Sequence, residues 1–147
     1  MNIKILKLLS ISFVLSILNG YIFLLLNNYF FHLKNKKLQS LSSGDLHFLT
    51  LLLAPVIETI IYQYFLYLIL NNILKLKNEI LIIIIMAAAF GLSHTYHWLY
   101  MCTTFIGGLI LNNFYIQIIK MKNMRYAVLL TMLLHFLYNL YGNLFIG

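Results

Sequence analysis

Three stretches of this chain place acid–base side chains inside otherwise apolar sequence. Glu58 lies in APVIETIIYQ, and His94 ends FGLSH. His135 and Asn139 are the first and last residues of HFLYN. A carboxylate can act as general base on water, while imidazole and amide groups can hold that water or stabilise an oxyanion. This set of groups is chemically sufficient to hydrolyse an amide bond.

The spacing within two of these stretches predicts that each presents one helix face. His135 and Asn139 are four residues apart, which in an α-helix is about 40° in direction and about 6 Å in height. Phe90 and His94 have the same separation, and the small residues at 87–89 and 91 would let a second helix approach closely. We therefore expect these side chains to converge on one cavity.

Membrane-spanning helices are the elements that must position these groups. Of the 147 residues, 63% are hydrophobic and 9% are charged, whereas a soluble domain is about 25% charged. This composition excludes a soluble globular protein. Apolar runs of roughly 20 residues, the length that crosses a bilayer as a helix, predict an all-α, polytopic transmembrane helical bundle with about five membrane-spanning helices: 5–31, 46–70, 79–96, 98–119 and 126–146.

We interpret residues 1–147 as a single membrane domain, with an N-terminal helix and loop at 1–45 and a core at 46–146. The connector 32–45 is the only strongly polar segment. The single cysteine, Cys102, excludes an intramolecular disulfide. Whether the chain forms oligomers is not visible in the sequence.

Lysine and arginine predict how the helices are oriented. If the N-terminus is cytosolic, seven basic residues flank the inner ends of the spans and three, at positions 34, 36 and 37, lie in the outer connector. The excess favours this orientation. The net charge is +7, and the basic residues flank apolar runs. We therefore expect them to contact membrane lipid and not nucleic acid.

Glu58 lies near the middle of its span, where an ionised carboxylate costs about 2.5–3.5 kcal/mol. A purely structural explanation is a protonated carboxyl that joins two helices by a hydrogen bond. Tyr62, four residues later, is a candidate partner on the same face. Pro55 removes a helical hydrogen bond and predicts a bend close to Glu58.

The ordered trio resembles the CPBP family of intramembrane metalloproteases, which includes CAAX prenyl protease 2, the Abi bacteriocin-immunity proteins and proteins similar to lysostaphin resistance protein A. The family pattern is Glu-Glu-x-x-x-Arg, then Phe-x-x-x-His, then His-x-x-x-Asn. Glu58, the Phe90/His94 pair and the His135/Asn139 pair match in order and spacing over residues 46–146. The resemblance implies that Glu58, His94, His135 and Asn139 are catalytic.

The first motif is degenerate. Thr59 stands where the family has its second Glu, and Gln63 stands where it has Arg. The resemblance makes these positions and Phe90 supporting residues around the catalytic ones, and Tyr62 joins them through its spacing from Glu58. Loss of both charges together is self-consistent, because a single buried charge without its partner would destabilise the fold.

The predicted reaction is endopeptidase cleavage of a membrane-associated peptide or protein. Glu58 acts as general base on a water also held by His94, while His135 and Asn139 donate hydrogen bonds to the oxyanion. The resemblance implies a divalent metal, and Glu58, His94 and His135 are chemically competent zinc ligands. The same residues can also activate water without metal, so zinc stays open at this point.

Two other functions are compatible with these residues. The first is a catalytically inactive member of the fold that binds a partner or confers bacteriocin self-immunity, which Thr59 and Gln63 favour. The second is a small proton or ion carrier, because buried Glu and His residues also form relays.

The composition, rich in Ile, Asn and Lys, suggests a multi-pass protein of a bacterial cytoplasmic membrane. In the prenyl-protease relatives the cavity is expected to face the cytosol, whereas the basic-residue count places His94 toward the outer side. Which face the cavity opens to is therefore left open by the sequence.

Overall fold

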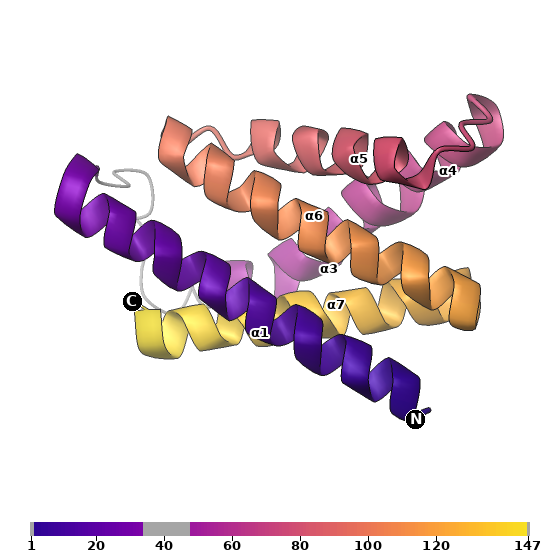
Figure 1. The fold of residues 1–147 in the computed structure, drawn as a ribbon, viewed down its shortest axis with the longest axis horizontal. Helices are drawn as coiled ribbons and strands as arrows, with labels where there is room; N and C mark the ends of the chain where they lie inside the picture. The colour runs from indigo at the N-terminus through magenta and orange to yellow at the C-terminus, as the bar shows by residue number, and fades with distance from the viewer. Residues whose placement is uncertain (1, 34–47, 147) are drawn as a thin grey trace.

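The computed structural model describes residues 2–33 and 48–146, and these form helices with no strand among them. The π-helical segments carry the label η. In chain order the main elements are α1 (Ile3–Leu26), η1 (Asn27–Phe31), η3 (Leu49–Leu53), α3 (Ala54–Glu58), η4 (Thr59–Phe65), α4 (Leu66–Leu68), η5 (Ile69–Ile73), α5 (Glu79–Ser93), α6 (Trp98–Met121), α7 (Met124–Tyr141) and η6 (Gly142–Ile146). In Figure 1 the helices run roughly lengthwise, and the stretch from α3 to α4 lies on the opposite diagonal to α6.

The predicted transmembrane bundle is confirmed. Four helical stretches among the described residues are long and apolar enough to cross a membrane: Ile3–Phe31, Leu51–Ile73, Trp98–Met121 and Met124–Phe145. The fifth, Glu79–Ser93, is apolar but shorter. Positions 46 and 47, where the second span was predicted to begin, lie outside the described residues.

The predicted boundary of the third span is wrong at its C-terminal end. The prediction extended this span to residue 96, but α5 ends at Ser93 because His94 leaves helical geometry, with φ −95° and ψ 64°. The second span also continues to Ile73, three residues beyond the predicted end. Hydropathy did not mark these ends, because the second span continues through the polar pair Asn71 and Asn72, and the third stops before the uncharged residues 94–96.

Polar side chains cap the helices of the core. The Asn78 side chain accepts a hydrogen bond from the Leu81 N–H at the start of α5. His97 Nδ1 accepts from the Tyr100 N–H at the start of α6, and Asn123 does the same for Tyr126 at the start of α7. Each cap satisfies a backbone donor that the first helical turn leaves without a partner.

The second span changes helical type along its length. The five-residue segment α3 lies between two π-helical segments, and Pro55 falls within its first turn. Because the helix continues from η3 into α3, Pro55 lacks an N–H that could donate to the preceding turn. The helical type changes from π to α at Ala54, next to Pro55 and one turn before Glu58, while the bend itself stays a prediction.

The helix α1 packs with its polar side inward. Ser12, Ser16 and Asn19 are buried, whereas large apolar residues of α1 such as Leu18 point outward. Asn19 Nδ2 donates to the Thr103 carbonyl at 3.0 Å. Because lipid tails are as apolar as leucine, polar groups gain most inside the bundle and apolar side chains are stable outside it.

Glycines bring α5 and α6 into close contact. A Cβ atom added at Gly91 would lie 2.9 Å from Phe105 Cβ and 3.0 Å from the Met101 carbonyl oxygen. One added at Gly108 would lie 3.1 Å from Ala87 Cα. The close approach predicted at residues 87–89 and 91 is therefore formed, with Gly108 as the small residue on the α6 side, while Gly107 faces the Asn19 side chain of α1 at 3.7 Å.

Candidate active site

Glu58 lies between two imidazole rings that come from different helices. One carboxylate oxygen, Oε1, is 3.7 Å from His94 Nε2, and the other, Oε2, is 3.5 Å from His135 Nε2. The three side chains are 23%, 14% and 5% exposed, respectively. The fold thus brings together three residues that are separated by 36 and 41 positions in the sequence.

The C-terminal end of α5 orients His94. Its Nδ1 atom lies 2.7 Å from the carbonyl oxygen of Phe90. A carbonyl can only accept, so this contact places the proton on Nδ1 and leaves Nε2 of a neutral ring as an acceptor. His94 therefore presents a lone pair toward the Glu58 carboxylate.

Ser93 lies beside His94 but takes part in the same local hydrogen bonding. Its hydroxyl donates to the Phe90 carbonyl at 2.7 Å and lies 3.1 Å from His94 Nδ1. Because Nδ1 carries the proton that it donates to Phe90, it is not a base available to Ser93. The geometry therefore supports an orienting contact and not a serine nucleophile.

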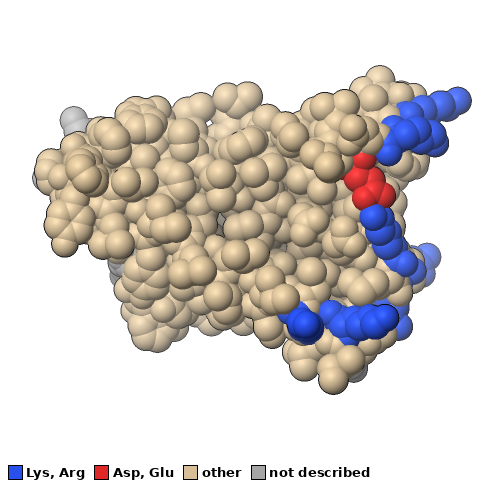
Figure 2. All heavy atoms as spheres, in the orientation of Figure 1, with Lys and Arg blue, Asp and Glu red and all other residues tan. Residues whose placement is uncertain are grey.

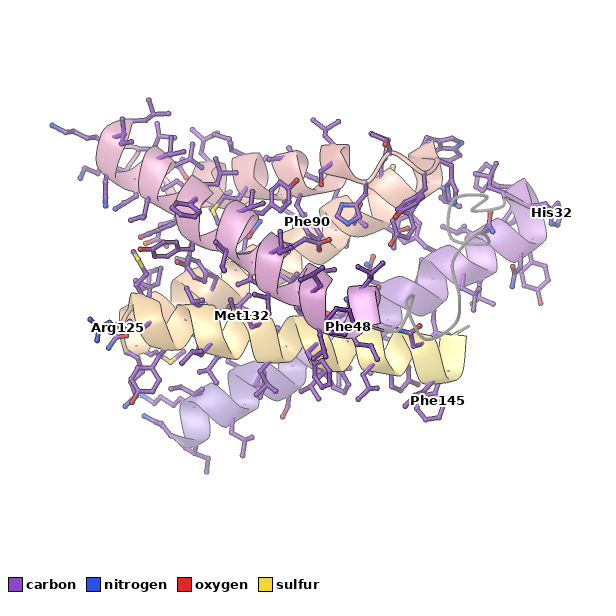
Figure 3. All side chains as sticks on the ribbon, turned by 180° about the vertical axis from the view of Figure 1, so that it is seen from behind. His32, Phe48, Phe90, Arg125, Met132 and Phe145 are labelled. Atoms are coloured by element: carbon purple, nitrogen blue, oxygen red, sulfur yellow. The ribbon has the colours of Figure 1, made fainter. Side chains whose placement is uncertain are left out.

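The Phe90 ring forms a wall shared by both histidines. Its centroid lies 4.6 Å from that of His94 and 6.0 Å from that of His135. Tyr62 packs edge-on against the same ring at 5.4 Å. Phe90 is labelled in Figure 3, where it lies between the ends of the bundle on the inner side of α5. Packing against one buried ring limits how far either imidazole can rotate.

His135 and Asn139 belong to adjacent turns of α7. His135 is buried, and its Nδ1 atom has no hydrogen-bond partner among the described residues. Its ring can therefore carry the proton on Nε2 and donate toward Glu58. Asn139 is half-buried one turn further on, and its carbonyl accepts a hydrogen bond from Asn143 Nδ2 at 3.2 Å.

A cavity of about 300 Å³ opens beside this group. It is lined by Ile57, Glu58, Ile61, Tyr62, Ser93, His94, Thr95 and Tyr96. The lining combines residues of α3 and η4 with the connection between α5 and α6. The cavity therefore gives a substrate access to Glu58 and His94.

The two positions that depart from the charged motif are buried. Thr59 and Gln63 have no exposed surface, and Gln63 Nε2 donates to Asn112 Oδ1 of α6 at 3.0 Å. A neutral amide pair therefore joins η4, the segment that follows Glu58, to α6. The sequence reasoning did not identify Asn112, although a polar residue in the middle of a membrane span is the signal that would have found it.

Tyr100 was also not predicted as a neighbour of the site. Its ring centroid lies 5.8 Å from that of His94, and its ring also contacts Tyr96 and His97. Nothing in the local sequence distinguishes Tyr100 from the other aromatic residues near this membrane boundary. Only the fold of the α5–α6 connection places it against the catalytic candidate.

The arrangement does not fit a three-residue metal site. Among the residues that the structure describes, no group of three His, Cys, Asp or Glu side chains is placed to hold one metal ion. We therefore derive no chemical step through a metal.

Comparison with known proteins identifies the family. A family model described as type II CAAX prenyl endopeptidase Rce1-like matches residues 45–141, which include Glu58 and both histidines. No curated protein and no solved structure matches the chain. Since the family match covers the greater part of the sequence and the second to fifth spans, the chain belongs to the Rce1-like type II CAAX prenyl endopeptidase family.

Proposed function

We propose that this protein is an intramembrane endopeptidase that hydrolyses a peptide bond of a membrane-associated polypeptide. The observation that carries the proposal is the Glu58 carboxylate, which lies 3.7 and 3.5 Å from the two imidazoles at the edge of a cavity of about 300 Å³. A carboxylate between two imidazoles, open to a cavity, supplies a base and hydrogen-bonding groups at one point.

Water is the proposed nucleophile. The distance of 3.7 Å between Glu58 Oε1 and His94 Nε2 is too long for a direct hydrogen bond, but one water molecule can donate to both acceptors. Glu58 takes a proton from this water while the water oxygen attacks the carbonyl carbon of the substrate. His94 fixes the direction of attack because its own Nδ1 proton is held by Phe90.

The α7 residues are proposed to stabilise the tetrahedral intermediate. His135 Nε2–H and the Asn139 side-chain amide donate to the oxyanion that forms when the carbonyl is attacked. When the intermediate collapses, the C–N bond breaks and the departing amine takes the proton that Glu58 removed from water. Atoms and charge balance without a covalent enzyme intermediate.

A carboxylate-to-amide substitution tests the general base. Glu58→Gln keeps the shape of the side chain but cannot accept the proton, so we expect the cleavage rate to fall by about 10²–10⁴-fold. The matched control is Glu79→Gln, which alters a carboxylate paired with Lys120 at the end of the bundle. The measurement is cleavage of membrane peptides in lipid. Equal rates for wild type and Glu58→Gln would refute the mechanism.

Partner binding without catalysis is the second candidate, with bacteriocin self-immunity as one form of it. The observation that favours it is the neutral Gln63–Asn112 pair where the family motif carries a charge. A wild-type protein that binds membrane peptides, and still binds them with Glu58→Gln, but cleaves none, would establish binding as the function.

The resemblance to a metalloprotease family predicts that cleavage requires zinc. The mechanism proposed above, which assigns the activation of water to Glu58 and His94, instead predicts that cleavage survives a strong chelator. Loss of cleavage on chelation, with recovery on added zinc but not magnesium, would show that a bound metal is required.

A further inference from the structure

The described lysine and arginine residues gather at one end of the bundle. All seven described Lys and Arg residues lie near one end of the bundle, as Figure 2 shows at its right-hand side. They sit at the start of α1, after η5, and around the α6–α7 turn: Lys4, Lys7, Lys75, Lys77, Lys120, Lys122 and Arg125. We refer to this as the basic end.

The candidate active site lies toward the other end. Helix α5 begins at the basic end, where Glu79 pairs with Lys120 at 2.6 Å, and His94 follows its last residue. The 15 residues of α5 rise about 22 Å, so His94 lies about that far from the basic end in a hydrocarbon layer about 30 Å thick. In Figure 3 Arg125 and Phe145 mark opposite ends of the bundle, and Phe90 lies between them.

The cavity opens on the side away from the basic end. Half of its lining is formed by residues 93–96, which are the last residue of α5 and the three residues that follow it. The other half includes Ile57 and Ile61, which are 44% and 47% exposed on the lipid-facing surface. A polypeptide can therefore reach Glu58 from the far membrane surface or sideways from the adjoining leaflet.

We infer that the cavity opens to the extracytoplasmic side, and that the substrate is a polypeptide cleaved at its extracytoplasmic membrane boundary. Clusters of Lys and Arg next to spans stay on the cytosolic side. The three other lysines, Lys34, Lys36 and Lys37, lie outside the described residues, and counting all three against the basic end still leaves seven to three. The inference rests on the proposed peptidase function for its substrate, but not for its orientation.

The orientation predicts which positions a membrane-impermeant thiol reagent can reach. In a Cys102→Ser background, Phe145→Cys at the cavity end should be labelled in intact cells. Met121→Cys lies at the basic end and leaves all seven cations in place, so it should be labelled only after permeabilisation. Tyr96→Cys, in the cavity lining, should behave as Phe145→Cys does. The reverse pattern would overturn the inference.

Substrate position is tested in the same cells. The experiment compares two membrane polypeptides with the same transmembrane helix. In the first, a mixed set of flanking sequences lies on the extracytoplasmic side of that helix. In the second, the same set lies on the cytosolic side. We expect cleavage only of the first, and loss of that cleavage with Glu58→Gln. Cleavage of the cytosolic version would overturn the substrate assignment. Outward labelling without cleavage of either version would support the orientation and count against the proposed peptidase.

Discussion

Phe90 supports both histidines of the site, one through its backbone and both through its ring. Its carbonyl accepts the Nδ1 proton of His94, and its ring packs against His94 and His135. At the scale of single residues, the site therefore depends on a side chain with no acid–base chemistry of its own. Such orientation determines which imidazole nitrogen meets the reacting groups.

Asn139 provides the residue-scale prediction. If its amide donates to the oxyanion, Asn139→Ala should lower kcat by about 10²–10³-fold while KM changes little, because the hydrogen bond forms only in the transition state. Steady-state kinetics on a cleaved membrane peptide would measure this. Asn113→Ala, which alters an exposed asparagine of α6, is the control and should retain activity. A rise in KM at constant kcat would place Asn139 in substrate binding instead.

At the element scale, the close packing of α5 on α6 positions His94. Gly91 lies three residues before His94, and the nearest atoms to an added Cβ belong to the backbone and Cβ of α6 residues. Neither helix can move a single side chain aside to make room. The register between these helices is therefore coupled to the position of the imidazole.

Gly91→Ala tests this coupling. The added methyl group would overpack the crossing, so we expect the free energy of unfolding to fall by about 1–3 kcal/mol and the cleavage rate to fall with it. Unfolding in mixed detergent micelles measures the first effect. Gly142→Ala is the matched control, since a Cβ there meets nothing within 4 Å. Equal stability of the two variants would contradict the packing argument.

The neutral pair between η4 and α6 gives a second prediction at this scale. Gln63→Arg alone would bury an uncompensated cation beside Asn112, with an expected loss of about 3–5 kcal/mol of folding free energy. Adding Thr59→Glu supplies a nearby anion and should recover part of that loss. A double-mutant cycle in detergent measures the coupling. Strictly additive effects would show that positions 59 and 63 do not interact.

At the scale of the whole molecule, lipid replaces water as the surrounding solvent. Helix α1 buries Ser12, Ser16 and Asn19 and turns Leu18 outward with 50% exposure. The same distribution in water would expose a large apolar surface and favour aggregation. The bundle is therefore held together by interhelical polar contacts and close packing, such as the bond from Asn19 to the Thr103 carbonyl.

Leu18→Lys tests this arrangement. A lysine near the middle of the first span should reduce the favourable free energy of membrane insertion by about 2.5–3.5 kcal/mol, which a membrane-integration assay can measure. Leu18→Ala at the same position should insert almost normally. If the lysine variant inserts as well as the alanine variant, the outward face of α1 does not contact lipid.

Sequence alone determined the membrane class, the number of helices and the residues to compare with a family pattern, because hydropathy and spacing are local properties. It also predicted close helix contact at the small residues 87–89 and 91, since such residues within apolar runs permit it, and the structure forms this contact at Gly91. It extended the third span beyond Ser93, because the residues that follow are still largely aromatic.

Only the tertiary structure decided which groups meet. No sequence pattern paired Gln63 with Asn112 or set Tyr100 against His94, because these contacts depend on the rotation and register of separate helices. The same is true of the two oxygens of Glu58, each of which faces a different imidazole. Spacing along a helix fixes a face, but the packing of five helices fixes what that face touches.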